Sequence, residues 1–285
     1  MRFRTCDLKF MIKTLTAFLL SLTFASCVTL HEDNFFFPKN KGPLPPEEGV
    51  VVEQLTLPSG NETLSGVLVK NPSKDYLLFF YGNGQSIYEA KARLYYLSRE
   101  YNLNVICFDY RGYGKSTGKP SFDSLMTDAG AVYNFVSKAY KPKRLYMFSQ
   151  SIGTVPCTFL GSSRMFNGII MEAGFTSGKE AVPRLNEGAP FPPIKYWVKL
   201  TADEALLNRK PQPIDMIRSF KAPLLYMHGT ADEVFPQDIG KRLFEAAGSK
   251  DKVFCSLPGT GHSNVDLTAS PAKEAIVSFF KKNKK

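Results

Sequence analysis

Strand-like and helix-like segments alternate from residue 50 to the end of the chain, and this alternation constrains the fold more than any other feature. The strand-like runs are short, apolar and rich in β-branched and aromatic residues, whereas the intervening segments repeat apolar residues at helical spacing. Strands that alternate with helices form βαβ units, whose parallel strands build a sheet covered on both faces. The sequence therefore predicts one α/β domain with a mostly parallel central sheet.

The elements can be placed along the chain from these patterns. Strands are predicted at 51–57, 63–69, 75–84, 104–114, 144–151, 166–175, 222–232 and 252–262, and the first two form an antiparallel pair. Helices are predicted at 85–100, 122–140, 152–163, 236–248 and 270–280. A chain of 285 residues with 44% hydrophobic content can bury one core of this size. In such sheets ligands bind beyond the carboxyl ends of the strands, so a site is expected there.

Residues 147–156, MFSQSIGTVP, contain two serines two positions apart, followed by a glycine. Reading the stretch as S-x-S-x-G centres it on Ser151, with Ser149 and Gly153 as flanks. This pattern is typical of a nucleophile elbow, a strained turn from strand to helix whose flanks must be small because strand and helix nearly touch. Centring on Ser149 would put the long Met147 at one flank. Ser151 is therefore the predicted nucleophile.

A serine hydroxyl needs a base, and histidine is the usual base at neutral pH. The chain has three histidines. His31 precedes every predicted core element, and His228, at the end of a strand, is expected to bond the turn that follows it. His262 lies in the glycine-rich turn PGTGHSN after the last strand, from which it can reach the carboxyl edge of the sheet. His262 is the predicted base.

Two further features complete the predicted constellation. Asp232, in GTADEVFP, is expected to fix the tautomer of His262 and to stabilise its charged form, with Glu233 as the competing carboxylate. Backbone N–H groups must also stabilise the developing oxyanion. Ile152, directly after the nucleophile, is predicted to supply one donor. Asn83, in the glycine-rich loop YGNGQS, is predicted to supply the other.

Together, the segments YGNGQS, DYRGYGKS, FSQSIGT, HGTADEVFP and GTGHS resemble those of α/β-hydrolases, in the compact branch with serine-aminopeptidase-like and acyl-protein-thioesterase-like members. The resemblance runs from about residue 50 to the C-terminus, and the order nucleophile, acid, base matches that superfamily. It implies the α/β-hydrolase fold and hydrolysis through an acyl-enzyme. The branch usually has histidine where Tyr81 stands and glycine where Ser149 stands. DYRGYG, residues 109–114, is expected to be structural.

The N-terminus is typical of an export signal. Lys13 precedes an uncharged run that ends near residue 30, and Met11 is a second possible start. Residues 24–27, FASC, resemble the lipobox of bacterial lipoproteins, which implies a cleaved signal peptide at 1–26 and lipid attachment at Cys27. An unlipidated secretory signal and an uncleaved anchor remain alternatives. The Pro-rich, aperiodic stretch 27–48 is predicted to be a tether.

Composition excludes several classes of function. The excess of 36 Lys and Arg over 26 Asp and Glu gives a net charge of +10, but no basic helix or aromatic-interleaved basic sheet indicates nucleic-acid binding. The five cysteines have no metal-ligand or disulfide spacing, and Cys107, Cys157 and Cys255 lie in apolar segments. No metal or other cofactor is expected.

The resulting hypothesis is a membrane-anchored lipoprotein of the cell envelope, with a hydrolase domain at 49–285. A lid or specificity segment, about 178–221, contains Trp197 and is expected either to pack as ordinary helices or to form an apolar acyl-chain wall. The expected reaction is hydrolysis of carboxylic esters or thioesters of small-molecule or lipid acyl substrates. A serine peptidase, a non-catalytic surface-binding lipoprotein, and a periplasmic or secreted location are the alternatives.

Overall fold

The computed structural model describes residues 26–40, 42, 44–45, 47–181, 198–203 and 207–284. Within these ranges the central feature is an eight-stranded sheet in the order β10-β9-β7-β6-β4-β5-β3-β2. Its strands are β2 (Val51–Ser59), β3 (Glu62–Lys70), β4 (Asp75–Phe80), β5 (Asn104–Phe108), β6 (Arg144–Gln150), β7 (Gly168–Glu172), β9 (Leu224–Gly229) and β10 (Lys252–Leu257). The six neighbouring strands β10, β9, β7, β6, β4 and β5 are parallel to one another, which confirms the predicted α/β class.

The antiparallel edge of the sheet is the predicted leading pair. β2 pairs with β3 over its whole length, from Val51 opposite Lys70 to Ser59 opposite Glu62. β3 then pairs antiparallel with β5. The hairpin turn between them uses Gly60, whose φ of 60° lies in the left-handed region that glycine adopts without strain. The short turn segment PSGN, residues 58–61, therefore determines both the turn and the register of this pair.

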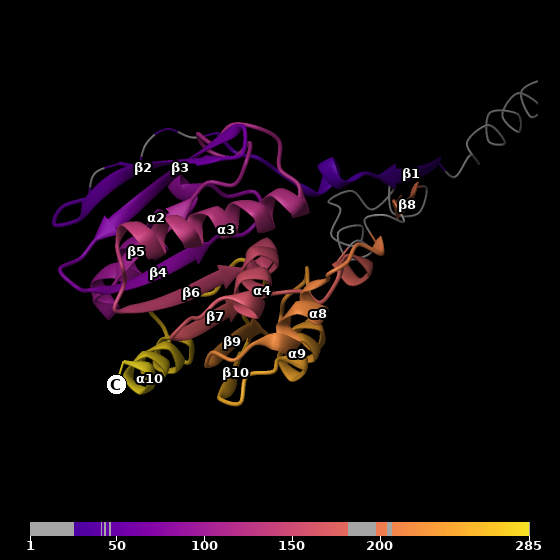
Figure 1. Cartoon of the computed structure of the whole chain (residues 1–285). Helices are drawn as coiled ribbons and strands as arrows, with labels where there is room; N and C mark the ends of the chain where they lie inside the picture. The colour runs from indigo at the N-terminus through magenta and orange to yellow at the C-terminus, as the bar shows by residue number, and fades with distance from the viewer. Residues whose placement is uncertain are drawn as a thin grey trace, which may run out of the picture.

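Helices cover both faces of the sheet (Figure 1). α2 and α10 lie on the same face, because the ring of Tyr101 in α2 contacts that of Phe280 in α10, with 4.9 Å between ring centroids. α3, α4 and α9 belong to the other face, where α4 packs against α3 and against α8. The helices are α2 (Ile87–Tyr101), α3 (Phe122–Ala139), α4 (Thr154–Ser163), α8 (Pro213–Met216), α9 (Gln237–Ala246) and α10 (Ala272–Asn283).

The starts of the helices after β4 and β5 are fixed by side-chain caps. Ser86 caps α2, and Glu89 returns a bond to the Ser86 backbone, so the two residues form a capping box. Ser121 and Ser124 make the equivalent reciprocal pair at α3. These caps fix where the loops beyond β4 and β5 end, and those loops lie at the carboxyl edge of the sheet.

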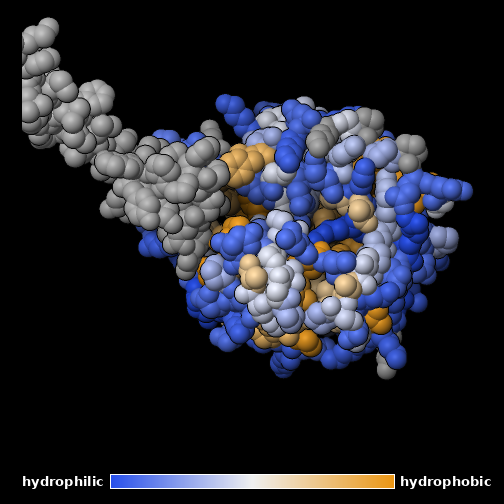
Figure 2. Space-filling model, turned by 180° about the vertical axis from the view of Figure 1, so that it is seen from behind, coloured by the Kyte–Doolittle hydropathy of each residue, from blue (hydrophilic) through white to orange (hydrophobic). Residues whose placement is uncertain are grey.

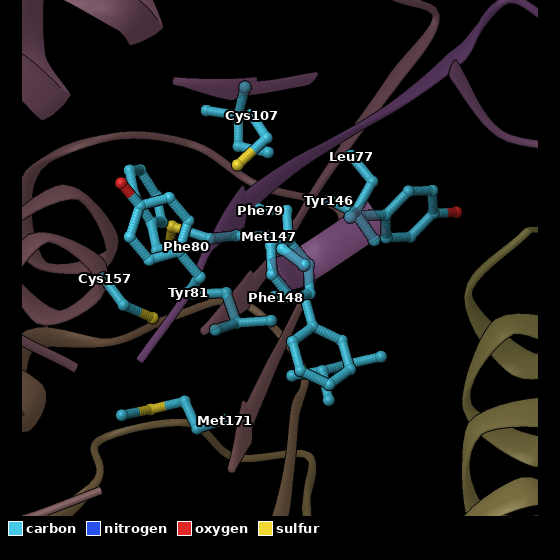
Figure 3. Close-up of a cluster of buried hydrophobic side chains, with 14 of the residues drawn as sticks. Leu77, Phe79, Phe80, Tyr81, Cys107, Tyr146, Met147, Phe148, Cys157 and Met171 are labelled. Carbon is cyan, nitrogen blue, oxygen red and sulfur yellow. The ribbon is translucent and has the colours of Figure 1, made fainter. Parts of the chain in front are cut away.

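The core is centred on β4 and β6, the middle strands (Figure 3). Phe79 and Phe148 stack at 5.2 Å, and both side chains are fully enclosed. Cys107 and Cys157 are buried in the same region, as expected for small apolar side chains, and burial raises the pKa of both thiols. Outside the core, the face in Figure 2 is mostly hydrophilic, with hydrophobic residues gathered in a few hollows.

The segment predicted as a tether is partly ordered against the domain. Residues Ser26–Leu30 form β1, which pairs in parallel with β8 (Val198–Ala202) apart from the central sheet (Figure 1). Cys27, the predicted lipid-attachment residue, lies opposite Lys199 in this pair. A 3-10 turn, η1 (Glu32–Phe35), follows, and Phe35 and Phe36 are buried in the core. The sequence predicted a free tether because this segment has no helical or strand-like periodicity. Isolated aromatic rings can nevertheless be buried without such a periodicity, and here two of them are.

Other predicted segments fall wholly or partly outside the described residues. These are most of the signal peptide and the part of the lid that includes Trp197. The described part of the lid includes α8 and the 3-10 turn η3 (Ile217–Ser219). No helix in the described part of the chain combines the length and the hydropathy needed to cross a membrane.

Candidate active site

Ser151 occupies the sharp turn between β6 and α4. Its φ is 50°, in the left-handed region that residues with a Cβ seldom adopt. Two residues later the chain passes close to the neighbouring strand β4: a Cβ added at Gly153 would lie 2.5 Å from the Phe80 carbonyl oxygen. The predicted elbow geometry is therefore present, with Ser149 fully buried in β6 and Ser151 exposed enough to line a cavity.

The structure brings the three predicted side chains into one hydrogen-bonded row. His262 Nε2 lies 2.9 Å from Ser151 Oγ, and His262 Nδ1 lies 2.8 Å from Asp232 Oδ2. Both distances are within the range in which a base takes a proton from a nucleophile and an acid orients that base. This arrangement can activate a hydroxyl and return its proton to a leaving group.

The Asp232 carboxylate is enclosed by donors. Oδ1 accepts hydrogen bonds from the Val234 and Phe235 backbone N–H groups at 2.9 and 2.7 Å. Oδ2 faces both His262 and, at 3.1 Å, His228 Nε2. Burial alone would raise the pKa of Asp232, but hydrogen bonds to His228 and His262 outweigh it and hold the pKa below its usual value. Asp232 is therefore ionised at neutral pH.

Glu233, His228 and His31 have partners other than the His262 ring. Glu233 Oε2 accepts from the His262 backbone N–H at 3.3 Å, so it contacts the main chain of the base rather than its ring. His228 is fully buried, and its Nε2 lies 2.7 Å from the Phe235 carbonyl oxygen, so it bonds the following turn as predicted. His31 pairs with Asp203 at 2.7 Å.

Asn83 and Ile152, the predicted oxyanion donors, line the same cavity as Ser151 and His262. Gly82, one residue before Asn83, approaches Ser151: a Cβ there would lie 3.6 Å from that of Ser151. The Asn83 side chain is held in place because Oδ1 accepts from Tyr113 Oη at 2.6 Å and from the Gly84 N–H at 3.0 Å. These bonds fix the loop that carries Asn83 beside Ser151.

Tyr81 is a structural part of this loop. Its hydroxyl donates to Asp109 Oδ1 at 3.1 Å and accepts from the Tyr110 N–H at 3.1 Å, and its ring is fully buried between Tyr110 and Tyr113. Asp109 also accepts from the Ile87 N–H at the start of α2. The DYRGYG segment thus orders the edge of the site, in agreement with its predicted structural role.

Replacing Tyr81 with phenylalanine tests this structural role. The change leaves the buried Tyr110 N–H without its acceptor, so we expect the free energy of unfolding to fall by roughly 1–3 kcal/mol. Because the Tyr81 side chain does not line the cavity, KM should change little at temperatures where the variant is folded. Urea denaturation and steady-state kinetics measure the two quantities. A large rise in KM with unchanged stability would instead assign Tyr81 a substrate contact.

The cavity over Ser151 has a volume of about 210 Å³ and is lined mainly by apolar side chains. These come from the N-terminal segment, from α3 and α4, and from the loops after β7 and β9; they are Phe35, Phe37, Phe122, Met126, Ile152, Val155, Phe175, Val234 and Phe235. Among the described lining residues Arg209 is the charged exception, and it pairs with Asp123 and Glu32. The lining suits a hydrocarbon chain.

The loop that carries His262 is held by a partly buried ion pair. Arg93 of α2 bonds Glu172 at the end of β7 at 2.6 Å and donates to the Val265 carbonyl oxygen at 2.9 Å. The Glu172 side chain is fully buried, so this pair fixes three elements in one place. Among the described residues, no group of side chains has the arrangement of a metal site.

Sequence reasoning missed Arg93, Phe35 and Phe37. Arg93 reaches partners 79 and 172 residues away, and no local pattern indicates such contacts. For the phenylalanines a signal existed, namely three consecutive aromatic residues, FFF, within an otherwise polar stretch. A run of this kind is costly to leave in water and favours packing on a neighbouring surface.

The parallel sheet, the elbow and the row of Ser151, His262 and Asp232 define an α/β-hydrolase fold. A sequence profile described as serine aminopeptidase, S33, matches residues 72–216. The chain belongs to this family of hydrolases, which confirms the resemblance drawn from its motifs.

Relatives and solved structures agree with this assignment. The chain is 32% identical over 199 residues to alpha/beta hydrolase domain-containing protein 17B of Xenopus laevis, a match that covers 69% of this chain and 63% of that protein. The esterase Pf2001 of Pyrococcus furiosus superimposes with a TM-score of 0.71 at 18% identity, over 87% of this chain and 98% of the esterase. Acetyl xylan esterase 1 of Thermoanaerobacterium sp. superimposes with a TM-score of 0.62 at 14% identity, over 87% and 88%. At these identities, the structural likeness shows the shared fold.

Proposed function

We propose that the protein is an exported serine hydrolase that cleaves carboxylic ester or thioester bonds of acyl substrates. The observation that carries the proposal is a serine, histidine and aspartate hydrogen-bonded in series at the floor of an apolar cavity. Esterases among the structural neighbours are consistent with it. Ser151 attacks the acyl carbon, and His262 accepts the Ser151 proton and passes it to the leaving alcohol or thiol. Water then releases the acid from the acyl-enzyme.

The remaining groups have supporting roles in this mechanism. The ionised Asp232 orients the His262 ring through Nδ1 and stabilises its protonated form. The Asn83 and Ile152 backbone N–H groups stabilise the oxyanion of each tetrahedral intermediate, a contribution of about 2.7–4 kcal/mol per donor in a comparable enzyme. The apolar side chains around Ser151 bind the acyl chain and exclude water.

The cavity lining favours esters over peptides. An aminopeptidase needs an anionic group to hold the substrate's amino terminus, and the described residues that line the cavity include no carboxylate. Arg209, the cation there, is already compensated by Asp123 and Glu32. The family is named for an aminopeptidase, so cleavage of esters and of peptide-like amides must be compared directly. A non-catalytic binding protein has no need of the Ser151–His262 contact at 2.9 Å.

One experiment separates these functions. The purified protein is treated with a fluorophosphonate probe and assayed on p-nitrophenyl esters, acyl thioesters and aminoacyl p-nitroanilides. We expect labelling of Ser151 and turnover of esters or thioesters well above that of anilides. Preferential cleavage of the anilides would favour the peptidase, and absence of labelling and of any turnover would favour the binding protein.

We also propose that Cys27 carries a lipid that anchors the protein to the membrane of the cell envelope. The lipobox-like residues FASC support this attachment. Glu32 lies five positions after Cys27, at most about 18 Å along an extended chain, and it begins the turn that packs against the domain. An anchor at Cys27 would therefore hold the cavity close to the bilayer.

Changing Cys27 to alanine tests the anchor. We expect wild-type protein to partition into the detergent phase and the variant to be released, or to remain unprocessed at its N-terminus. Several acyl chains are lost in the variant, and each buried methylene contributes about 0.8 kcal/mol to membrane attachment. Phase separation and intact-mass measurement give the two readouts. A variant that matures and remains equally membrane-bound would indicate an uncleaved anchor.

A further inference from the structure

Residues 32–37, here termed the N-terminal strap, contribute Phe35 and Phe37 to the lining of the cavity although they precede the family-matched region at 72–216. The strap is attached near its start by Glu32. Its Oε1 accepts from the Phe122 N–H, in the first turn of α3, at 2.6 Å and lies 3.5 Å from Arg209 Nη1. Two separate parts of the cavity wall thus hold the beginning of the strap.

The end of the strap is attached to the loop that holds the proposed oxyanion donor. The Asn83 side chain donates to the Phe35 carbonyl oxygen at 2.5 Å and accepts from the Phe37 N–H at 3.0 Å. The Tyr113 hydroxyl lies 3.0 Å from the same Phe37 nitrogen. These contacts use the backbone of the strap, and the rings of Phe35 and Phe37 take no part in them.

The three phenylalanines of the strap have two different roles. Phe36 is buried and packs against Phe122 at 5.3 Å, which anchors the strap. Phe35 is 5% exposed and lines the cavity together with Phe37. Phe37 is 54% exposed, so a large apolar ring stands at the cavity opening with much of its surface in water. A hydrocarbon chain lying in the opening would cover this ring.

We propose that the strap is the acyl-chain specificity element, in which Phe35 and Phe37 contact the substrate chain beyond its first few carbons. This inference rests on the proposed function and names its substrate class as esters or thioesters of medium and long linear acyl chains. A short acyl group at Ser151 gains little from Phe37 at the opening, whereas a longer chain buries apolar surface against it. Binding energy then rises with chain length.

The test compares Phe37→Ala with wild type on p-nitrophenyl acetate and p-nitrophenyl octanoate. Because Asn83 and Tyr113 hold Phe37 through its backbone N–H, alanine removes the ring and leaves both contacts in place. We expect the octanoate-to-acetate ratio of kcat/KM to fall by roughly tenfold, mainly through a higher KM for octanoate. Phe35→Leu, which retains an apolar side chain at a buried position, should lower the ratio by a smaller factor.

Met165→Ala is the matched control, because Met165 is also a large exposed apolar side chain but lies just after α4, at the opposite edge of the sheet from the cavity. The octanoate-to-acetate ratio of kcat/KM of Met165→Ala should equal that of wild type. A Phe37→Ala ratio equal to wild type, or an equal loss on both esters, would overturn the proposal. Failure of the proposed function looks different, because wild-type protein would then hydrolyse neither ester nor react with the fluorophosphonate.

Discussion

Replacement of Ser151 by alanine should lower ester hydrolysis by on the order of 10⁴–10⁶-fold, whereas replacement of Ser149 should leave most of the activity. Ser151 Oγ lies 2.9 Å from His262 Nε2 and lines the cavity. Loss of the nucleophile removes the acyl-enzyme route, and only the binding contribution of the site remains. Initial rates on a p-nitrophenyl ester and fluorophosphonate labelling measure the effect.

Ser149→Ala is the internal control for this prediction. Ser149 is fully buried in β6, where it pairs with Phe80 of β4 and Met171 of β7, and its hydroxyl cannot reach a substrate. Alanine fits the same space and keeps the small flank that the elbow requires. If the two variants lost activity equally, or if only Ser149 mattered, Ser151 would not be the nucleophile.

Replacement of Asp232 by asparagine should lower kcat by about 10⁴-fold, the loss seen for the equivalent change in a serine protease. Asparagine can present its amide N–H₂ to His262 Nδ1, which favours the tautomer that cannot accept the Ser151 proton. Glu233→Gln is the matched control, since its side-chain oxygen can still accept from the His262 backbone N–H. Activity of Glu233→Gln should stay within a few-fold of wild type. The reverse ranking would make Glu233 the acid.

Wild type and Asp232→Asn should also differ in how their stability depends on pH. The pKa of Asp232 is lower in the folded protein than the unfolded value of about 3.9. Its ionised form therefore stabilises the fold above that unfolded value, and this stability is lost as the pH falls through the folded-state pKa. We expect wild type to exceed Asp232→Asn in free energy of unfolding at pH 5–7, and the difference to shrink below pH 4. Urea titrations at each pH measure it, and a difference independent of pH would contradict the prediction.

Local sequence signals were sufficient to predict the fold and the three residues Ser151, Asp232 and His262 that the structure brings into one row. The strand RLYMFSQ, the small residues around Ser151 and the turns that hold Asp232 and His262 each carry their information within about ten residues. In a parallel sheet these turns must meet at one edge, so topology brought the side chains together without any knowledge of distances.

The remaining features depend on contacts between distant segments. Glu32 meets Phe122, 90 residues away, and Arg93 meets Val265, 172 residues away. Neither contact is encoded in a periodic pattern, and the strap HEDNFFFPKN is too short and irregular to indicate its partner. Its aromatic run predicts burial against some surface, but only the folded domain identifies that surface as the wall of the cavity.

The left-handed backbone at Ser151 bears on how natural substrates could be identified. A φ of 50° costs of order 1–3 kcal/mol for a residue with a Cβ, and alanine bears the same strain as serine. Ser151→Ala should thus keep the turn and the cavity in their native shape while lacking the attacking oxygen. Glycine relaxes there without penalty and would loosen the turn. The alanine protein is accordingly the suitable bait for capturing uncleaved acyl compounds from cell extracts, for identification by mass spectrometry.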